Sequence, residues 1–280
     1  MVAAIVAGSA MLISSVGLHR LIPYLRVPEK QVWSFRGTVR ELKSTLTDSD
    51  LLPLLFATLL IGTSFTAWGA LQVYIYSYFF ALSTAQLSGL TSIWLLGVVF
   101  GFLGTPLVSR GRDKRTMAIL MLCCVALAEA IPILLRYLDL FPVPDSAIYY
   151  PLVLAFICAD MTFFIVLMAL LGSMLADVSE KRESVSGQRE EGALYSTQSL
   201  IGKGSSALGV AISGVILDLI QFPTSTAASE ISQEVVNQLG LSVLLIFLFF
   251  YPVAMLSIRR FRIGRTEHLS SLKKLKGDHS

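Results

Sequence analysis

Four ionisable side chains fall inside long apolar stretches of the sequence: Glu129, Asp160, Lys203 and Asp218. A charge in the interior of a membrane is costly unless it faces protein or water, so such residues typically bind protons, ions or polar solutes. Asp218 is close to the end of its stretch, which predicts a position at the membrane boundary. Glu129 and Asp160 are nearer the middle, where the alternative to a functional role is a structural hydrogen bond to a neighbouring helix.

Lys203 is the strongest candidate because its surroundings are polar as well as apolar. It lies about ten residues inside its stretch, roughly 15 Å along a helix, from where its ammonium group reaches the membrane surface only with difficulty. Ser199 precedes it by four residues and projects from the same helix face. We therefore predict that both side chains point into one cavity.

Neither a metal site nor an enzyme active site is indicated by the other reactive residues. Cys123, Cys124 and Cys158 lie in apolar stretches, and the histidines lie near the ends of the chain, so no metal-ligand spacing exists. No apolar stretch holds a nucleophile beside a base. We expect no enzymatic activity, no metal and no organic cofactor.

Small residues recur along the stretch that contains Lys203. Gly202, Ser206, Gly209 and Ser213 follow one another at helical spacing. Such a stripe predicts a face along which a neighbouring helix approaches closely. It suits a helix that moves and a helix in a static bundle equally well.

The composition says which solvent surrounds these stretches. The chain has 280 residues, 54% of them hydrophobic and 15% charged, and a mean hydropathy of +0.70. Soluble domains average about 25% charged residues, and disordered chains contain fewer apolar residues. A soluble fold, disorder and nucleic-acid binding are therefore excluded, and an all-α polytopic membrane bundle is predicted. Seven predicted helices span 2–24, 51–80, 88–108, 116–136, 148–176, 193–220 and 240–258.

Basic residues mark alternate connections between these helices. Nearly all of the 22 lysines and arginines lie in residues 25–50, 109–115 and 179–192 and in the tail after residue 258. The connections in between, residues 81–87, 137–147 and 221–239, contain none. Because basic loops stay on the cytoplasmic side, we expect the N-terminus outside and the C-terminus in the cytoplasm.

The region around Lys203 resembles a known family. The residues that carry the resemblance are Leu175-Ala176-Asp177, Glu180, Arg189, Glu191-Gly192, Tyr195, Gln198 and Lys203-Gly204-Ser205-Ser206-Ala207. They are similar to the glycoside, pentoside and hexuronide cation symporters, the melibiose-carrier branch of the major facilitator superfamily. The basic turn from Arg110 to Arg115 resembles, more loosely, a loop motif of that superfamily.

The resemblance implies a secondary active transporter with two six-helix halves, which carries a sugar or glycoside by cation-coupled symport and alternating access. Residues 1–24 would be the sixth helix, 25–50 the central cytoplasmic loop, 51–258 the six-helix C-terminal half and 259–280 a basic cytoplasmic tail. The expected partners are a small solute, the lipid bilayer of the plasma or inner membrane, and an N-terminal half that this chain lacks.

The resemblance also implies site residues. Lys203, Gln198 and Ser199 would face the substrate and coupling cavity, and Asp177, Glu180 and Arg189 would form a cytoplasmic gate against the other half. The coupling ion would be Na+ or H+, held by acidic residues of the absent half and so not by this chain. Glu129 and Asp160 remain intramembrane acidic candidates without a family role.

Two alternatives stay open. The melibiose carriers have a tryptophan where this chain has Met168. The loss of that aromatic platform leaves room for a non-sugar solute such as a lysophospholipid, because lysophospholipid carriers also have a lysine in the corresponding helix. The chain could also be a non-transporting remnant or interaction subunit that retains the family's helices.

Overall fold

The computed structural model describes residues 2–21, 51–186, 191–223 and 231–261. The chain divides into two compact units, Met1–Arg40 and Glu41–Ser280, and each is described by itself. In the first, helix α1 (Val2–Leu21) forms within the predicted range 2–24. The predicted central loop at residues 25–50 and tail at 259–280 lie largely or wholly outside the described residues.

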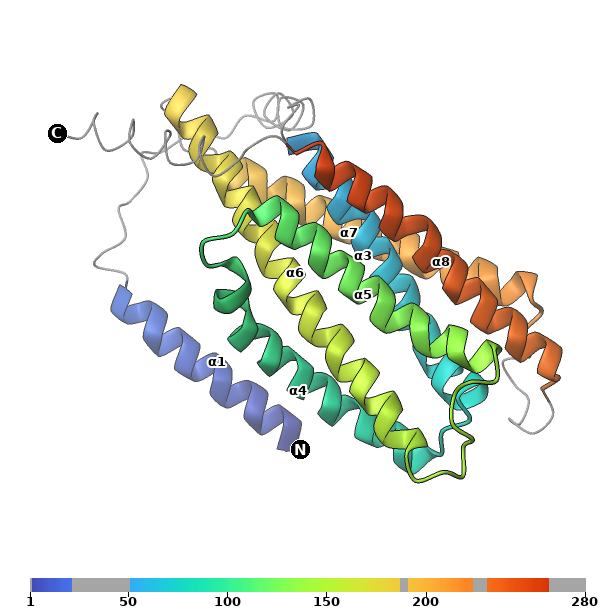
Figure 1. Ribbon diagram of the computed structural model, residues 1–280. Coiled ribbons are helices and arrows are strands. Elements are labelled where there is room, and N and C mark those ends of the chain that lie inside the picture. The colour runs from blue at the N-terminus through green and yellow to red at the C-terminus, as the bar shows by residue number, and fades with distance from the viewer. Residues whose placement is uncertain (1, 22–50, 187–190, 224–230, 262–280) are drawn as a thin grey trace. The chain divides into compact units, whose positions relative to one another are not determined.

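The second unit is a bundle of helices, coloured from blue to red in Figure 1. Six of its helices are long and apolar enough to cross a membrane, which confirms an all-α polytopic membrane fold. They are α3 (Leu51–Tyr74) with its π-helical continuation η2 (Ile75–Phe79), α4 (Thr84–Ser109), α5 (Lys114–Tyr137), α6 (Tyr149–Ser186), α7 (Glu191–Leu219) and α8 (Gln233–Arg259).

The packing order of these helices differs from their order in the sequence. The first helix of the first triplet, α3, packs against α7 and α8, the last two helices of the second triplet. Correspondingly, α6 packs against α4 and α5, and the third helices α5 and α8 pack against each other. The two triplets therefore exchange partners in a symmetric way, as expected for an internal repeat of three helices.

Two helix boundaries differ from the prediction by more than five residues. Helix α6 continues to Ser186, ten residues beyond the predicted end, so Asp177 and Glu180 lie on a helix and not in a loop. Helix α8 begins at Gln233, within the predicted connection 221–239, because the Ser232 hydroxyl accepts a hydrogen bond from the backbone N–H of Val235 and caps the helix. Hydropathy marks the membrane core and cannot show how far a helix extends beyond it.

The turn between α4 and α5 is built from local signals. Gly111 adopts φ 73°, in the left-handed region that glycine occupies without strain. Two residues later, the Asp113 carboxylate accepts a hydrogen bond from the backbone N–H of Thr116 at 3.0 Å and caps α5. This turn places the basic residues Lys114 and Arg115 at the start of α5.

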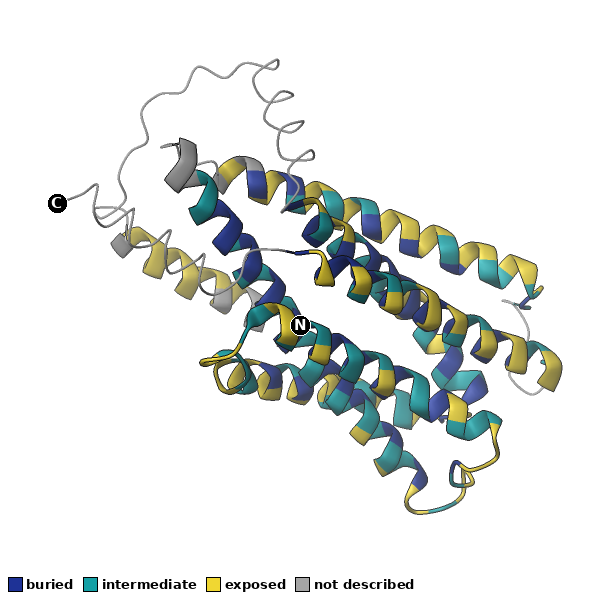
Figure 2. Ribbon diagram, turned by 45° about the horizontal axis from the view of Figure 1, so that its top comes forward, coloured by how far each residue is buried: buried dark blue, intermediate teal, exposed yellow. Residues whose placement is uncertain are grey.

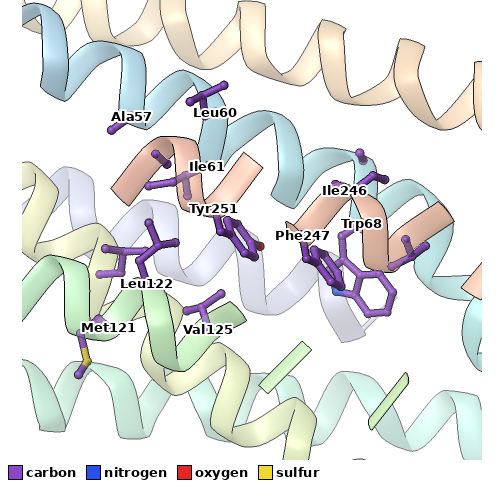
Figure 3. Close-up of a cluster of buried hydrophobic side chains, with 14 of the residues drawn as sticks. Ala57, Leu60, Ile61, Trp68, Met121, Leu122, Val125, Ile246, Phe247 and Tyr251 are labelled. Atoms are coloured by element: carbon purple, nitrogen blue, oxygen red, sulfur yellow. The ribbon is translucent and has the colours of Figure 1, made fainter. Parts of the chain in front are cut away.

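The core lies between α3, α5, α6 and α8. Figure 3 shows Phe247 of α8 beside Trp68 of α3, with Tyr251 of α8 next to Phe247 and with Leu122 and Val125 of α5 in the same cluster. The rings of Phe247 and Tyr251 stack with centroids 5.7 Å apart, and Phe247 meets Trp68 edge-on at the same separation. Burial differs strongly between helices. In its most apolar stretch, the span of α3 and η2 has 56% of its residues buried, against 11% for α4 and 17% for α7. Exposed apolar side chains therefore cover the outer helix faces that Figure 2 colours yellow.

The predicted small-residue stripe on α7 is partly wrong. Gly202 and Ser206 are exposed, and no atom lies within 4 Å of a Cβ placed on Gly202. The face that packs against α3 carries Ser205, Gly209 and Ser213, all buried. At Gly209 the helices are so close that an added Cβ would lie 2.6 Å from Thr66 Cβ and 2.7 Å from the carbonyl oxygen of Thr63. Small residues sit on both faces of α7, and the sequence pattern alone does not show which face packs.

Candidate functional site

A cavity of about 470 Å³ lies between α3, α4 and α6. Its polar groups come from three different helices: Gln72, Thr91 and Asp160. Two tryptophans, Trp68 and Trp94, form part of its wall, and the other lining residues are Phe65, Gly69, Val73, Tyr76, Leu87, Leu90, Ile157 and Met161. Its size falls in the range of small-molecule sites, about 300–1,000 Å³, and a mainly apolar wall with a few polar groups is typical of them.

The π-helical segment η2 brings Tyr76 to this cavity. A π-turn holds one more residue than an α-turn, so side chains after it are displaced around the helix axis, and such segments often occur at functional sites. The end of η2 is held from α5, where Arg136 Nε donates a hydrogen bond of 2.7 Å to the carbonyl oxygen of Phe79. Tyr149 of α6 likewise donates its hydroxyl to the carbonyl oxygen of Phe80 at 2.7 Å.

A second cavity of about 20 Å³, large enough for about one water molecule, lies directly behind the first. The two cavities share four lining residues: Trp68, Tyr76, Ile157 and Asp160. Glu129 of α5 lines only the small cavity. The two predicted acidic candidates are thus brought to one site, although they lie on different helices.

The two carboxylates have very different partners. Glu129 is 5% exposed, and its Oε2 accepts a hydrogen bond of 2.6 Å from the hydroxyl of Tyr251 in α8. Asp160 is 6% exposed, and its Oδ1 has no hydrogen-bond partner among the described residues. A buried polar atom without a hydrogen-bond partner destabilises the folded protein by about 1–3 kcal/mol. Binding of a ligand or a proton at this oxygen would remove that penalty.

Lys203 lies in a separate, open groove on α7. This groove shares no residue with the other two cavities, and it is lined by Tyr195, Ser196, Ser199, Leu200 and Lys203. Lys203 and Ser199 are both exposed in it, while Gln198 is half-buried and does not line it. No carboxylate of the described residues forms an ion pair with Lys203.

The residues predicted for a cytoplasmic gate lie at the end of α6. Asp177 is buried, and both of its carboxylate oxygens accept hydrogen bonds of 2.7 Å from Lys114 Nζ of α5, in the same helix bundle. Glu180 is half-buried three residues further along. Arg189 lies outside the described residues. The Lys114 to Asp177 pair braces two helices at this end, which the sequence did not indicate.

Replacing Lys114 with methionine should lower the free energy of unfolding by about 1–3 kcal/mol, because it removes the charged donor that α5 supplies to the buried Asp177 carboxylate. Thermal unfolding in detergent measures the change. Arg112→Met, at an exposed position in the same turn, is the matched control. The double variant Lys114→Met with Asp177→Asn should lose less stability than the sum of the two single variants. Strict additivity would mean that the pair does not hold the helices together.

Several residues of the large cavity were missed from the sequence. Trp68, Trp94 and Gln72 lie within apolar stretches, where an aromatic ring or a single amide gives no signal of its own. Tyr251 was also missed, because its hydroxyl gains meaning only from Glu129, which lies far away in the sequence. Among the described residues, no three histidine, cysteine, aspartate or glutamate side chains come together as metal ligands.

Comparison with known proteins agrees with this architecture. The family model described as "MFS/sugar transport protein" matches residues 1–265 of the chain. No curated protein matches the chain closely enough to count as a relative.

Proposed function

This chain belongs to the MFS/sugar transport protein family, and we propose that it forms part of a carrier that moves a sugar or glycoside by cation-coupled symport and alternating access. The observation that carries the proposal is the cavity between α3, α4 and α6, with two tryptophans beside Gln72, Thr91 and Asp160. The apolar C–H face of a sugar ring packs on an indole. Its hydroxyls pair with amide, hydroxyl and carboxylate groups, which are all present.

The charge of the cavity favours a neutral solute over a lysophospholipid. No lysine or arginine lines either cavity in the described part of the chain, while Asp160 contributes a carboxylate to both. A phosphate group binds most strongly to arginine, lysine or helix N-termini, and a nearby carboxylate repels it. Lys203 could bind a phosphate group, but it lines the separate groove on α7 and not the large cavity.

The proposed roles of the other predicted residues follow from their positions. The groove with Lys203 and Ser199 faces away from the packed core, so we assign it to contact with the solute or with an N-terminal half of six helices. The end of the bundle that carries Lys114, Asp177 and Glu180 is the proposed cytoplasmic end, where pairing with the other half would gate the inner side. Uptake would then require both halves.

Intrinsic fluorescence tests solute binding directly. The chain contains three tryptophans, and Trp68 and Trp94 both line the large cavity. In a Trp33→Phe protein the emission therefore comes from the two tryptophans that line this cavity. We expect saturable quenching or a spectral shift with a transported sugar such as melibiose or lactose, and no competition by lysophosphatidylcholine. Displacement of the sugar by the lysolipid would favour the lipid alternative.

Labelled sugar uptake by cells without their own sugar carriers tests the transport itself. With both halves expressed, Trp68→Leu and Trp94→Leu should each reduce uptake about tenfold, which corresponds to about 1.4 kcal/mol of lost stacking. Phe249→Leu, an exposed aromatic residue of α8 that lines neither cavity, should change uptake less than twofold. Unchanged uptake in both tryptophan variants would contradict a sugar site here. Absence of uptake with both halves present would favour a non-transporting subunit.

A further inference from the structure

The buried acidic pair has no cationic partner in the described part of the chain. The small cavity is lined by both Glu129 and Asp160. Its other lining residues carry no charge, and among them only Tyr76 has a hydroxyl group. Two ionised carboxylates buried together without a cation are costly, because each has lost its hydration and repels the other. A positive charge must therefore be supplied from outside the protein.

A metal ion fits this site poorly. Hard cations in proteins take about six or more oxygen ligands from carboxylates, carbonyls and water. The side chains that line the small cavity offer only the two carboxylates and the hydroxyl of Tyr76. The cavity volume of about 20 Å³ leaves room for no more than about one water molecule to complete a coordination shell. A proton needs neither space nor further ligands.

We propose that Glu129 and Asp160 together bind one exchangeable proton and form a proton site in the wall of the solute cavity. Two observations carry this proposal independently: the meeting of two buried carboxylates in one small cavity, and the buried Oδ1 of Asp160 that has no hydrogen-bond partner. A proton on Asp160 removes one of the two negative charges and turns the orphaned oxygen into a donor.

Besides α5 and α6, which carry the pair, three elements bring polar or aromatic groups to it: α8, η2 and α3. Tyr251 of α8 donates its hydroxyl to Glu129, and Tyr76 of η2 lines both cavities. Trp68 from α3 does not ionise, and no lysine, arginine or histidine of the described residues lines either cavity. Tyrosine hydroxyls stay protonated near neutral pH, so they act as fixed donors. Among the described residues at the site, the two carboxyl groups are thus the only ones expected to exchange a proton near neutral pH.

The position of Asp160 connects the proton to the solute. This residue lines both cavities, so a solute in the larger one can contact the group that takes up or releases the proton. When protonated, Asp160 can donate a hydrogen bond to a sugar oxygen and accept one from a sugar hydroxyl. Proton and solute would then bind cooperatively, as symport requires. This consequence rests on the proposed function, whereas the proton site itself does not.

Infrared spectroscopy of the chain in lipid nanodiscs tests the proton site without any transport. The carbonyl stretch of protonated carboxyl groups is followed from about pH 4 to about pH 9 in choline chloride. We expect a band equivalent to one carboxyl group to persist at about pH 7, where exposed aspartates and glutamates, with pKa values of about 4, have lost their protons. If the whole band of the unaltered chain disappeared at the pH at which exposed carboxyl groups lose their protons, the proposal would be overturned.

Variants assign the band to the pair. The double variant Glu129→Gln with Asp160→Asn should abolish the band at about pH 7. Either single substitution should make the band disappear at a lower pH, because the remaining carboxyl no longer faces a second negative charge. Asp218→Asn removes an exposed carboxyl of α7 and is the matched control, with an unchanged titration. A band that survives the double variant would belong to another residue and overturn the assignment.

Replacing choline with sodium at the same ionic strength separates the two coupling ions. A proton site predicts an unchanged titration. A shift of the titration to lower pH that grows with sodium concentration would show that sodium displaces the proton, and the site would then be a sodium site. If the proton site is present but no sugar is taken up in the separate uptake assay, only the proposed function fails.

Discussion

Alanine in place of Lys203 should abolish coupled uptake, with a loss of at least about 100-fold or about 2.7 kcal/mol. Among the described residues, Lys203 is the only basic one that lines the open groove of α7, and no described carboxylate forms an ion pair with it there. Its charge is therefore available to a hydroxyl group of the solute or to an anionic group of the other half. Because the charged side chain forms no ion pair within the described residues, its removal should leave membrane insertion and folding intact.

The controls for this prediction lie on the same helix. Ser206 is exposed and donates its hydroxyl to the carbonyl oxygen of Gly202 at 3.0 Å, so Ser206→Ala should leave uptake almost unchanged. Lys203→Arg retains the charge with a different shape and should retain partial uptake. Initial rates of labelled sugar uptake, normalised to the amount of protein in the membrane, make the comparison. Normal uptake by Lys203→Ala would remove this residue from the mechanism.

The same substitution, glycine to alanine, should have opposite effects at two positions of α7. At Gly209 the new methyl group would meet the backbone of α3, with Thr63 O at 2.7 Å and Ala67 N at 2.8 Å, so the helices must move apart. Overpacking of this kind costs about 1–3 kcal/mol. At Gly214 no atom lies within 4 Å of the new group, and alanine improves the helix by up to about 1 kcal/mol.

The midpoint of thermal unfolding of the two variants in the same detergent measures this difference. We expect Gly209→Ala to unfold at a lower temperature than the unaltered chain and Gly214→Ala at the same or a higher one. Comparable destabilisation of both variants would mean that α7 tolerates no substitution for reasons unrelated to α3. No effect of either would contradict the close approach of the two helices.

Hydropathy and charge predicted the helices of the bundle because the membrane imposes one requirement on every span, a long apolar helix. Glu129 and Asp160 were recognised individually for the same reason, since each is an exception to that requirement. Their meeting could not be predicted, because it depends on how α5 packs against α6 and how η2 and α8 close the cavity. Trp68 and Trp94 gave no signal at all, since a tryptophan in an apolar helix looks alike whether it faces lipid, core or solute.

The stripe on α7 shows where pattern reading was ambiguous. Two sets of small residues on α7 fit a helical face. The predicted set is Gly202, Ser206, Gly209 and Ser213, and the set that packs is Ser205, Gly209 and Ser213. The two faces overlap because both contain Gly209 and Ser213. Only the position of α3 distinguishes them. The length of α6 was likewise underestimated, because charged residues at its end fit a solvated helix as well as a loop.

The exchange of partners between the two helix triplets also constrains how the chain is made. Helix α3 leaves the ribosome before the two helices that cover it, α7 and α8, have been synthesised. Until then its small residues and cavity-lining side chains have no partner and depend on lipid or on the insertion machinery for cover. Substitutions that weaken α8 should therefore expose α3 in newly made protein and shorten its lifetime in the cell, even where they touch no residue of the solute cavity.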